Sequence, residues 1–426
     1  MLSVGEKIKQ IRKAKGLSME NLAAAINKSQ PYISRLERGD AECNPETLDA
    51  IKKFLGIENA PLLLYELELY RDRILACYRL QNAERYADAK TFLKGELSGI
   101  TSLPFEHSLQ TMYLSLETTT LLHEGRNGGF NDNIEIAEET ITKADAFVGN
   151  SCKEAQFMYY RTKSRVHQWK RELELRLKYL NKARDTDCSL INDYIFYTEF
   201  AMSYYNIGKL GKAITYCELA KSQEQGNYVD SMGASLNVIT CSCYLHAGEY
   251  EKAKKLLEVQ IAQAKSIDDK YRYATGLMLM GLAHQWQKQY KESIMYFEQA
   301  FQVGFNPLLP VCLAFSADSL RHMKEHDKCR DVLAKARKFV DGDIDAHIEA
   351  VDCLLTLEDS GSINKLERKL IPGARDSGVI GRGYALYLCN ELEAHYKKKR
   401  TKTKANAIAA IARDIYRDMY EGDIEL

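Results

Sequence analysis

The sequence predicts an all-α protein in which a small helical domain is followed by an array of helical hairpins. Prolines number only seven in 426 residues, and no segment shows the alternation of apolar and polar residues that is typical of a strand. The first sixty residues divide into four short helices with recognisable caps. Further along the chain, related blocks of sequence recur every 40 residues, as they do in repeat architectures.

Composition narrows the class of protein. Basic and acidic side chains number 59 each, and this neutrality argues against a chain coated in nucleic acid or lying on a membrane. No apolar run approaches the ~18 residues of a membrane span, which predicts a cytoplasmic protein with no membrane partner. The eleven cysteines lack paired spacing, and Cys241-x-Cys243 lacks a second ligand pair, so we expect free thiols, no metal and no cofactor.

Local signals set the ends of the four N-terminal helices. Ser18, Ser29 and Asn44 each precede a helical pattern and can cap it through a side-chain oxygen. Pro31 falls in the first turn of the third helix, where a missing N–H costs nothing. Asn27 tolerates the left-handed conformation of a tight turn. The helices are expected from about Val4 to Lys13, over MENLAAAI (19–26), from Ser29 to Arg38 before Gly39, and from Asn44 to Leu55 before Gly56.

The second and third helices are joined by about three residues, which is the helix-turn-helix arrangement. Its second member lies in the major groove of DNA, so a short helix suffices. Residues 1–39 carry eight basic and three acidic side chains, a net charge of +5 that indicates phosphate contacts. The alternative is a helical domain that uses this pattern to contact a protein. The side chains expected to face double-stranded DNA are Ser29, Gln30, Pro31, Tyr32, Ser34, Arg35 and Arg38.

The stretches IKQIRKAKGLSMENLAAAI and SQPYISRLERG, followed by NPETLDAIKKFLGI, resemble the Cro/C-repressor (XRE) helix-turn-helix family. Arg35 can form a bidentate pair with guanine and Gln30 one with adenine. The family usually begins the second helix with a glutamine that donates to a phosphate, and Met19 stands there in this chain. The resemblance implies that Gln30, Pro31 and Arg35 face bases, and that Ser29, Tyr32 and Arg38 face phosphates.

Three blocks align without gaps at a spacing of 40: YYNIGKLGKAITYCELA (204–220), YLHAGEYEKAKKLLEVQ (244–260) and HQWQKQYKESIMYFEQA (284–300). A small residue three positions after a bulky one, and another bulky residue four later, is the second-helix pattern of the tetratricopeptide repeat. The matching positions are Leu210, Tyr250 and Tyr290, then Ala213, Ala253 and Ser293, then Cys217, Leu257 and Phe297; Ala201, Cys241 and Gly281 are small residues of the first helices.

Looser copies of this pattern extend the array in both directions. They surround Tyr86/Ala89/Leu93, Leu173/Leu180/Ala183 and His326/Cys329/Leu333/Ala336, and another lies near Ile134–Ala144. A last helix pair is expected over 384–398 and 405–420. The basic run KKKRTKTK (397–404) between them is interpreted as a solvated turn, with a second nucleic-acid contact as the alternative.

Stacked hairpins form a superhelix whose first helices line a concave groove. The resemblance to the tetratricopeptide family implies that positions 2, 5, 9, 12 and 13 of each unit face that groove. Amides, two arginines and both tryptophans fall on these positions, which suits an extended peptide because amides pair with its backbone and arginine with a carboxylate. The alternative is that some of these side chains pack between helices. The residues expected to bind the peptide are Arg161, Arg165, Gln168, Trp169, Thr198, Met202, Tyr205, Asn206, Ser235, Val238, Ser242, His246, Met278, Gln285, Trp286, Asp318, Arg321 and His322.

A head of this type followed by such a body, from LERG through YYNIG onward, resembles the RRNPP regulators, which are intracellular receptors for peptide pheromones. The resemblance implies a homodimer whose DNA-binding heads are repositioned when a signalling peptide enters the groove, in quorum sensing or in the control of a mobile element. It also implies that an asparagine, here Asn206, holds the peptide backbone. We therefore expect a helix-turn-helix domain (1–60), a linker and first helix start (61–70), and a right-handed tetratricopeptide-like superhelix that binds peptide and dimerises (71–426).

Two other functions compete with this interpretation. Repeat proteins of the same family without a DNA-binding head sequester or dephosphorylate protein partners, so the body could be a scaffold for a phosphorelay protein. An independent enzyme is disfavoured, because HEGRN and HIEAV lack the second histidine of a metalloprotease motif and no phosphate-binding glycine loop is present.

Overall fold

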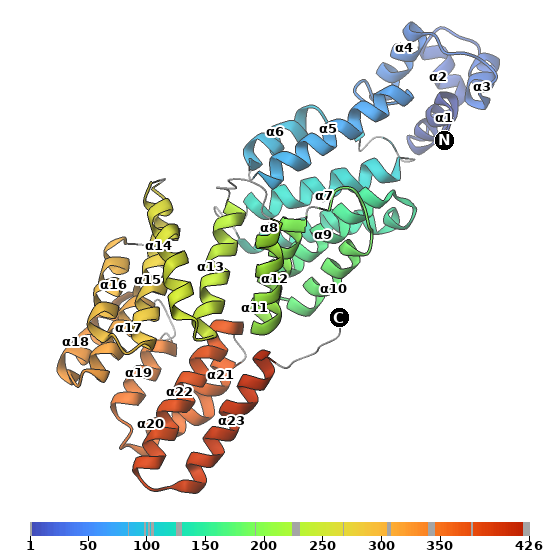
Figure 1. Cartoon of the computed structure of the whole chain (residues 1–426). Helices are drawn as coiled ribbons and strands as arrows, with labels where there is room; N and C mark the ends of the chain where they lie inside the picture. The colour runs from blue at the N-terminus through green and yellow to red at the C-terminus, as the bar shows by residue number, and fades with distance from the viewer. Residues whose placement is uncertain are drawn as a thin grey trace. The chain divides into compact units, whose positions relative to one another are not determined.

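The protein is built from helices (Figure 1), and in its described residues no strand is present. The chain forms two compact units, Met1–Ile191 and Asn192–Leu426, which we describe separately. The structure is a computed structural model that describes residues 2–83, 85–97, 99–100, 103, 106–124, 130–191, 193–223, 231–266, 268–304, 308–339, 346–375 and 378–420, without the side chains of 130–132, 231–235 and 378–380.

The first unit begins with the head, four short helices whose caps are those predicted. The side chains of Ser18, Ser29 and Asn44 each accept a hydrogen bond from a backbone N–H in the first turn that follows them. Asn27 has a φ of 52°, as the tight turn before the third helix requires. The helices are α1 (Val4–Ala14), α2 (Met19–Ala25), α3 (Gln30–Arg38) and α4 (Pro45–Leu55).

The segment after α4 packs closely against the head. Ala60 and Leu62 are fully buried, and the ammonium group of Lys7 donates to the carbonyl of Leu62 at 2.9 Å. The Glu66 carboxylate accepts from Lys52 at 2.8 Å and from the backbone N–H of Leu62 at 2.7 Å. These contacts fix the entry into α5 (Leu64–Asn82).

Helical hairpins complete the first unit. Each pairs a long helix with a shorter one, and the second helix starts at the bulky residue that the repeat pattern placed there in two of the three hairpins, Tyr86 and Leu173. The helices after α5 are α6 (Tyr86–Gly95), α7 (His107–Glu124), α8 (Phe130–Thr142), α9 (Lys153–Trp169) and α10 (Leu173–Arg184).

The second unit continues the array of hairpins. The bounds are α11 (Asp193–Ile207), α12 (Leu210–Ser222), α13 (Ser231–His246), α14 (Tyr250–Ser266), α15 (Lys270–Trp286), α16 (Tyr290–Gln302), α17 (Leu309–His322), α18 (His326–Ala336), α19 (Ala346–Leu355), α20 (Ser360–Lys365), α21 (Ile371–Arg375), α22 (Gly378–Lys398) and α23 (Lys402–Tyr420). A π-helical turn, Leu366–Leu370, joins α20 to α21.

The predicted repeat register is confirmed. Helices α12, α14 and α16 begin at the matched bulky residues, and the matched small and large positions that follow are buried. Gly281 of α15 shows why a small residue is needed, because a Cβ there would lie 2.5 Å from the Phe297 ring of α16. The apolar seam between each pair of helices therefore holds the hairpins together.

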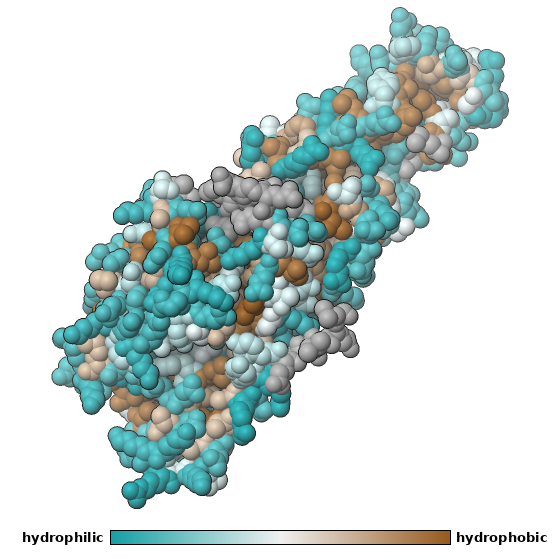
Figure 2. Space-filling view, viewed as in Figure 1, coloured by the Kyte–Doolittle hydropathy of each residue, from teal (hydrophilic) through white to brown (hydrophobic). Residues whose placement is uncertain are grey.

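The C-terminal helix pair also forms, with α22 starting earlier than predicted and residues 399–401 making the turn within the basic run. Its inner faces join the core of α11, α12 and α13 through residues such as Leu388, Leu392 and Ile415. On the face shown in Figure 2, hydrophilic residues cover most of the surface and hydrophobic residues form separate small patches. Among the described helices, none combines the length and apolar character that crossing a membrane requires.

Candidate functional site

Helix α3 presents a polar face to solvent. The Ser29 hydroxyl caps the helix by accepting from the backbone N–H of Tyr32 at 3.3 Å, and Pro31 lies in the first turn. Ile33 and Leu36 are buried on the opposite side. Among the predicted DNA-facing residues, Ser29, Gln30, Pro31, Arg35 and Arg38 are exposed, while Tyr32 and Ser34 are half-buried.

The exposed side chains of α3 differ in how they are held. Arg38 donates to the Asp40 carboxylate at 2.8 Å, and both side chains are 58% exposed, so this pair is weak enough to exchange for a phosphate. The Tyr32 hydroxyl donates to the carbonyl of Glu42 at 3.2 Å. Arg35 has no ion-pair partner among the described residues. A guanidinium group in this state can form two hydrogen bonds with a guanine edge.

A buried ion pair fixes α3 against α1. The Arg12 guanidinium group donates to both oxygens of Glu37, at 2.6 and 2.8 Å, and also to the carbonyl of Leu17 at 2.6 Å. Hydrogen bonding to Glu37 raises the pKa of Arg12. Gly5 lets the two helices touch, since a Cβ there would lie 1.7 Å from the carbonyl oxygen of Leu36. The buried ion pair and this close contact hold α3 against α1.

Four of the predicted peptide-binding residues belong to α9 in the first unit. Arg161 is only 3% exposed, and it donates to the Asn82 side chain at 3.0 Å and to the Tyr78 hydroxyl, so it holds α9 to α5. Arg165, Gln168 and Trp169 are half-buried. The structure thus gives Arg161 a packing role within the first unit.

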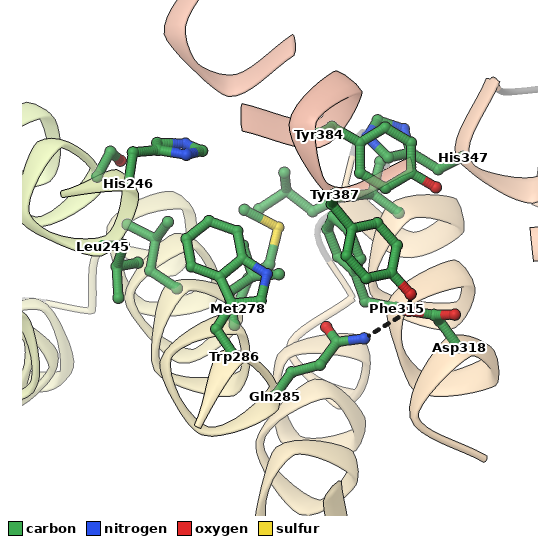
Figure 3. Close-up of a pocket in the computed structure, with 15 residues that line it drawn as sticks. Leu245, His246, Met278, Gln285, Trp286, Phe315, Asp318, His347, Tyr384 and Tyr387 are labelled. Atoms are coloured by element: carbon green, nitrogen blue, oxygen red, sulfur yellow. Dashed lines mark hydrogen bonds between the residues drawn. The ribbon is translucent and has the colours of Figure 1, made fainter. Parts of the chain in front are cut away.

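The second unit contains a cavity of about 240 Å³ between α13, α15, α17, α19 and α22 (Figure 3). Six predicted residues line it: Ser242, His246, Met278, Gln285, Trp286 and Asp318. Most of the remaining wall is apolar or aromatic, from Leu245, Leu279, Leu282, Leu308, Val311, Phe315, His347, Tyr384 and Tyr387.

A second, more polar space of about 490 Å³ adjoins this cavity, and we call it the vestibule. The two spaces share Leu245, His246, Gln285, Trp286 and Tyr387. The vestibule adds polar groups from α17 and α22, namely His322, Asn390 and Glu391, and the exposed Lys288. Together the two spaces offer an apolar recess beside a more polar one, a combination that is common in ligand sites.

A buried polar network closes one side of the cavity. Asp318 accepts from Arg321 at 2.8 Å, from the Gln285 amide at 2.9 Å and from the Tyr387 hydroxyl at 2.6 Å. Arg321 also pairs with Glu391 at 2.9 Å. Burial raises the pKa of Tyr387 well above its ordinary value, so its hydroxyl stays protonated and can donate. The network ties α17 to α22.

Helix α22 also contacts other elements of the second unit. A Cβ on Gly383 would lie 2.1 Å from the His246 ring of α13, so the two helices meet closely there. Arg382 donates to the carbonyl of Gly208, just after α11, at 3.3 Å. The Tyr384 ring lies 4.5 Å from that of His347 in α19. Burial lowers the pKa of His246 to about 4, so its imidazole is neutral at physiological pH.

The sequence pattern did not single out the α22 side chains, because they occupy no matched repeat position. Several predicted residues line neither space. Thr198 is buried, and its hydroxyl donates to the carbonyl of Tyr194 at 2.8 Å. Arg321 contributes through the network rather than as a lining residue. Met202, Tyr205, Asn206 and Val238 are half-buried away from both spaces, and the side chain of Ser235 lies outside the described residues.

Residues 8–58 match the family model described as helix-turn-helix. The HTH-type transcriptional regulator DdrOP3 of Deinococcus deserti is 32% identical over 83 residues, which are 20% of this chain and 64% of that relative. The chain thus spans less than two thirds of the curated relative that it matches. The described residues hold no group of three histidine, cysteine or acidic side chains suited to a metal ion.

Solved structures match over most of the chain. The apo form of the quorum sensor NprR from B. thuringiensis has a TM-score of 0.63 at 16% identity and covers 82% of this chain and 99% of its own. NprR in complex with its cognate peptide NprX has a TM-score of 0.59 at 17% identity, covering 82% and 98%. A Rap protein complexed with competence and sporulation factor has a TM-score of 0.60 at 13% identity, covering 83% and 98%.

These TM-scores show a common fold, and at identities this low the comparison shows the fold alone. Residues 8–58 are therefore a helix-turn-helix domain of the matched family, and the chain has the helical-repeat fold of the NprR and Rap structures.

Proposed function

We propose that this protein is a DNA-binding transcription regulator of the RRNPP type, switched by a short peptide that binds in the cavity and vestibule of its second unit. The observation that carries the proposal is the combination, in one chain, of a helix-turn-helix head with an exposed Arg35 and a recess of peptide-side-chain size. NprR, whose fold the chain shares, has been solved with its cognate peptide.

The repeat architecture supports the coupling that this proposal requires between the two sites. The cavity is bounded by four hairpin helices and by α22, so a bound peptide contacts several repeats at once. A solenoid changes curvature through small rotations at each repeat. A homodimer reads two half-sites about one DNA turn apart, so a change in the spacing of its heads alters affinity for the paired site.

The DNA-binding half of the proposal is tested with the full-length protein and the promoter DNA next to its gene. Arg35→Ala should weaken specific binding by about 1–3 kcal/mol and relax sequence preference at one base pair. Asp40→Ala frees Arg38 and should leave sequence preference unchanged. Fluorescence anisotropy with specific and scrambled duplexes measures both. If Arg35→Ala lowered the affinity for the specific and the scrambled duplex equally, base recognition by this residue would be excluded.

The peptide half is tested by intrinsic fluorescence, since the chain has two tryptophans and Trp286 borders both spaces. In a Trp169→Phe background, synthetic peptides from the nearest small open reading frame are titrated with and without operator DNA. A saturable change whose midpoint shifts with DNA supports a peptide-switched regulator, and its direction gives the sign of coupling. DNA binding without response to any such peptide would contradict the peptide switch.

A protein-interaction scaffold is the second candidate, favoured by the fold shared with Rap structures. It predicts a protein partner that binds full-length protein carrying Arg35→Ala as tightly as wild type. Affinity purification with this variant, followed by titration of the recovered protein, separates a scaffold from a regulator that acts on DNA.

A further inference from the structure

The cavity has the size of one large side chain. Its volume of about 240 Å³ falls below the ~300–1,000 Å³ that encloses a drug-sized ligand, so it admits one residue of a peptide while the rest lies in the vestibule. Met278, Leu282 and Phe315 provide apolar walls, and Figure 3 shows Trp286 and Tyr387 facing each other across the space. Burying a large apolar residue here would be favourable.

Charge in the wall does not favour an ionic guest. Asp318 could be read as a site for lysine or arginine, but its carboxylate already accepts three hydrogen bonds, one of them from the Arg321 guanidinium group. His246 is neutral because burial lowers its pKa. A cation or anion entering the cavity would lose its hydration without gaining a free counter-charge. The cavity therefore favours an uncharged ligand group.

One polar atom in the wall still needs a partner. Gln285 is 6% exposed, and its amide nitrogen donates to Asp318, which sets the orientation of the side chain. Its oxygen, Oε1, has no hydrogen-bond partner among the described residues and points toward the interior in Figure 3. A buried acceptor without a donor is costly, so a ligand N–H at this point removes an existing penalty.

From these observations we infer that the cavity binds one large, uncharged apolar residue of the peptide, and that a peptide backbone N–H next to that residue donates to Gln285. The inference rests on the proposed peptide-binding function and specifies its chemistry. It places the selective position of the peptide in the cavity between α13, α15, α17, α19 and α22 and makes Gln285 the residue that fixes the register of the backbone.

The test starts from a random heptapeptide library captured by the full-length protein and sequenced by mass spectrometry. Captured peptides should share one position restricted to leucine, isoleucine, methionine or phenylalanine. Replacing that residue by alanine should weaken binding about 10- to 100-fold, and replacing it by lysine should abolish binding. Trp286 fluorescence in the Trp169→Phe background gives the affinities.

Variants of the protein locate the contact. Val311→Phe narrows the cavity and should weaken the best peptide at least 10-fold, whereas Val332→Phe, a half-buried valine of α18 outside the cavity, should leave affinity unchanged. Circular dichroism confirms that both variants fold. Gln285→Met removes the acceptor and should lower the affinity for the peptide about 5-fold. Gln287→Met, two residues away and outside both spaces, should leave this affinity unchanged.

Backbone methylation closes the test. N-methylation at one peptide position should weaken binding to the wild-type protein about 5-fold. The same methylation should not weaken binding to Gln285→Met any further, because both changes remove the same hydrogen bond. Peptides captured without an apolar position, or indifferent to Val311→Phe and to methylation, would overturn the inference and leave a peptide receptor of another specificity. Capture of no peptide at all would overturn the proposed function and the inference with it.

Discussion

The head and the cavity region of the second unit share two structural features, a buried arginine–carboxylate pair and a glycine at a close contact between helices. Each has a buried arginine paired with a carboxylate. In the head, Arg12 has one carboxylate partner, Glu37, which it contacts with two nitrogens. In the cavity region, Arg321 lies between Asp318 and Glu391, so either acid alone could still neutralise it.

The second shared feature is a glycine where two helices touch. Gly5 of the head faces a backbone oxygen of α3, which cannot move without the helix. Gly383 of α22 faces the tip of the His246 side chain, which borders a cavity. The head therefore has no room to adjust, whereas the cavity region has spare volume and shared charges. Under the proposed function, the first suits a surface that contacts DNA without rearranging, and the second suits a site that adapts to a peptide.

The largest effect is expected from a substitution that breaks the buried ion pair of the head. Glu37→Gln leaves the Arg12 guanidinium group buried without a counter-charge, which should lower the stability of the head by about 3–5 kcal/mol. Amide hydrogen exchange in α1 and α3 of the full-length protein measures this loss. Asp40→Asn is the matched control, because it removes the partner of the exposed Arg38 and should cost less than about 1 kcal/mol. Similar exchange rates in the two variants would contradict a structural role for the buried pair.

The glycine contacts give a smaller and directly comparative test. Gly5→Ala forces α1 from α3 and should cost about 3 kcal/mol, while Gly383→Ala should cost about 1 kcal/mol because the His246 ring can turn into the cavity. Hydrogen exchange reports the first, and urea unfolding followed by Trp286 fluorescence reports the second. Gly373→Ala, where a Cβ meets nothing within 4 Å, is the control. Equal costs at Gly5 and Gly383 would remove the distinction between a rigid head and an adaptable cavity.

The sequence was sufficient for most of the fold because its signals are local. Ser18, Ser29 and Asn44 act within one turn of their own positions, and the 40-residue period places the start of each repeat's second helix. Gly281 could be expected at a close helix contact because its repeat partners are also small. Periodicity also brought Gln285 and Asp318 onto the inner face, where the structure has them lining one cavity.

Contacts distant in sequence could not be derived in this way. Nothing near Glu37 indicates that its partner is Arg12, since an ion pair between helices depends on their packing. The same holds for Tyr384 and Tyr387, which reach the cavity from a helix with no counterpart among the aligned repeats. Arg161 occupies an inner repeat position, but α5 covers it through Asn82, so repeat position alone does not settle exposure.

The smallest effect concerns pH and separates the cavity region from the head. The pKa of His246 falls from its ordinary 6.5 to about 4 because burial disfavours the charged ring. Between these values the unfolded chain binds more protons at this site than the folded chain. The contribution of His246 to the free energy of unfolding is therefore fully present above pH 6.5 and falls as pH drops toward 4.

The full shift in the pKa of His246 corresponds to ~3 kcal/mol, and partial solvent access to the residue reduces the expected loss of stability to about 2 kcal/mol. Urea unfolding followed by Trp286 fluorescence should show a smaller loss in His246→Gln than in wild type, because His322, whose pKa burial also lowers, remains. His326→Gln, at the exposed start of α18, should keep the full loss. Because His246 borders both cavity and vestibule, a peptide that fills the cavity should extend the pH range of stability downward, whereas hydrogen exchange in the head should show no contribution from this residue.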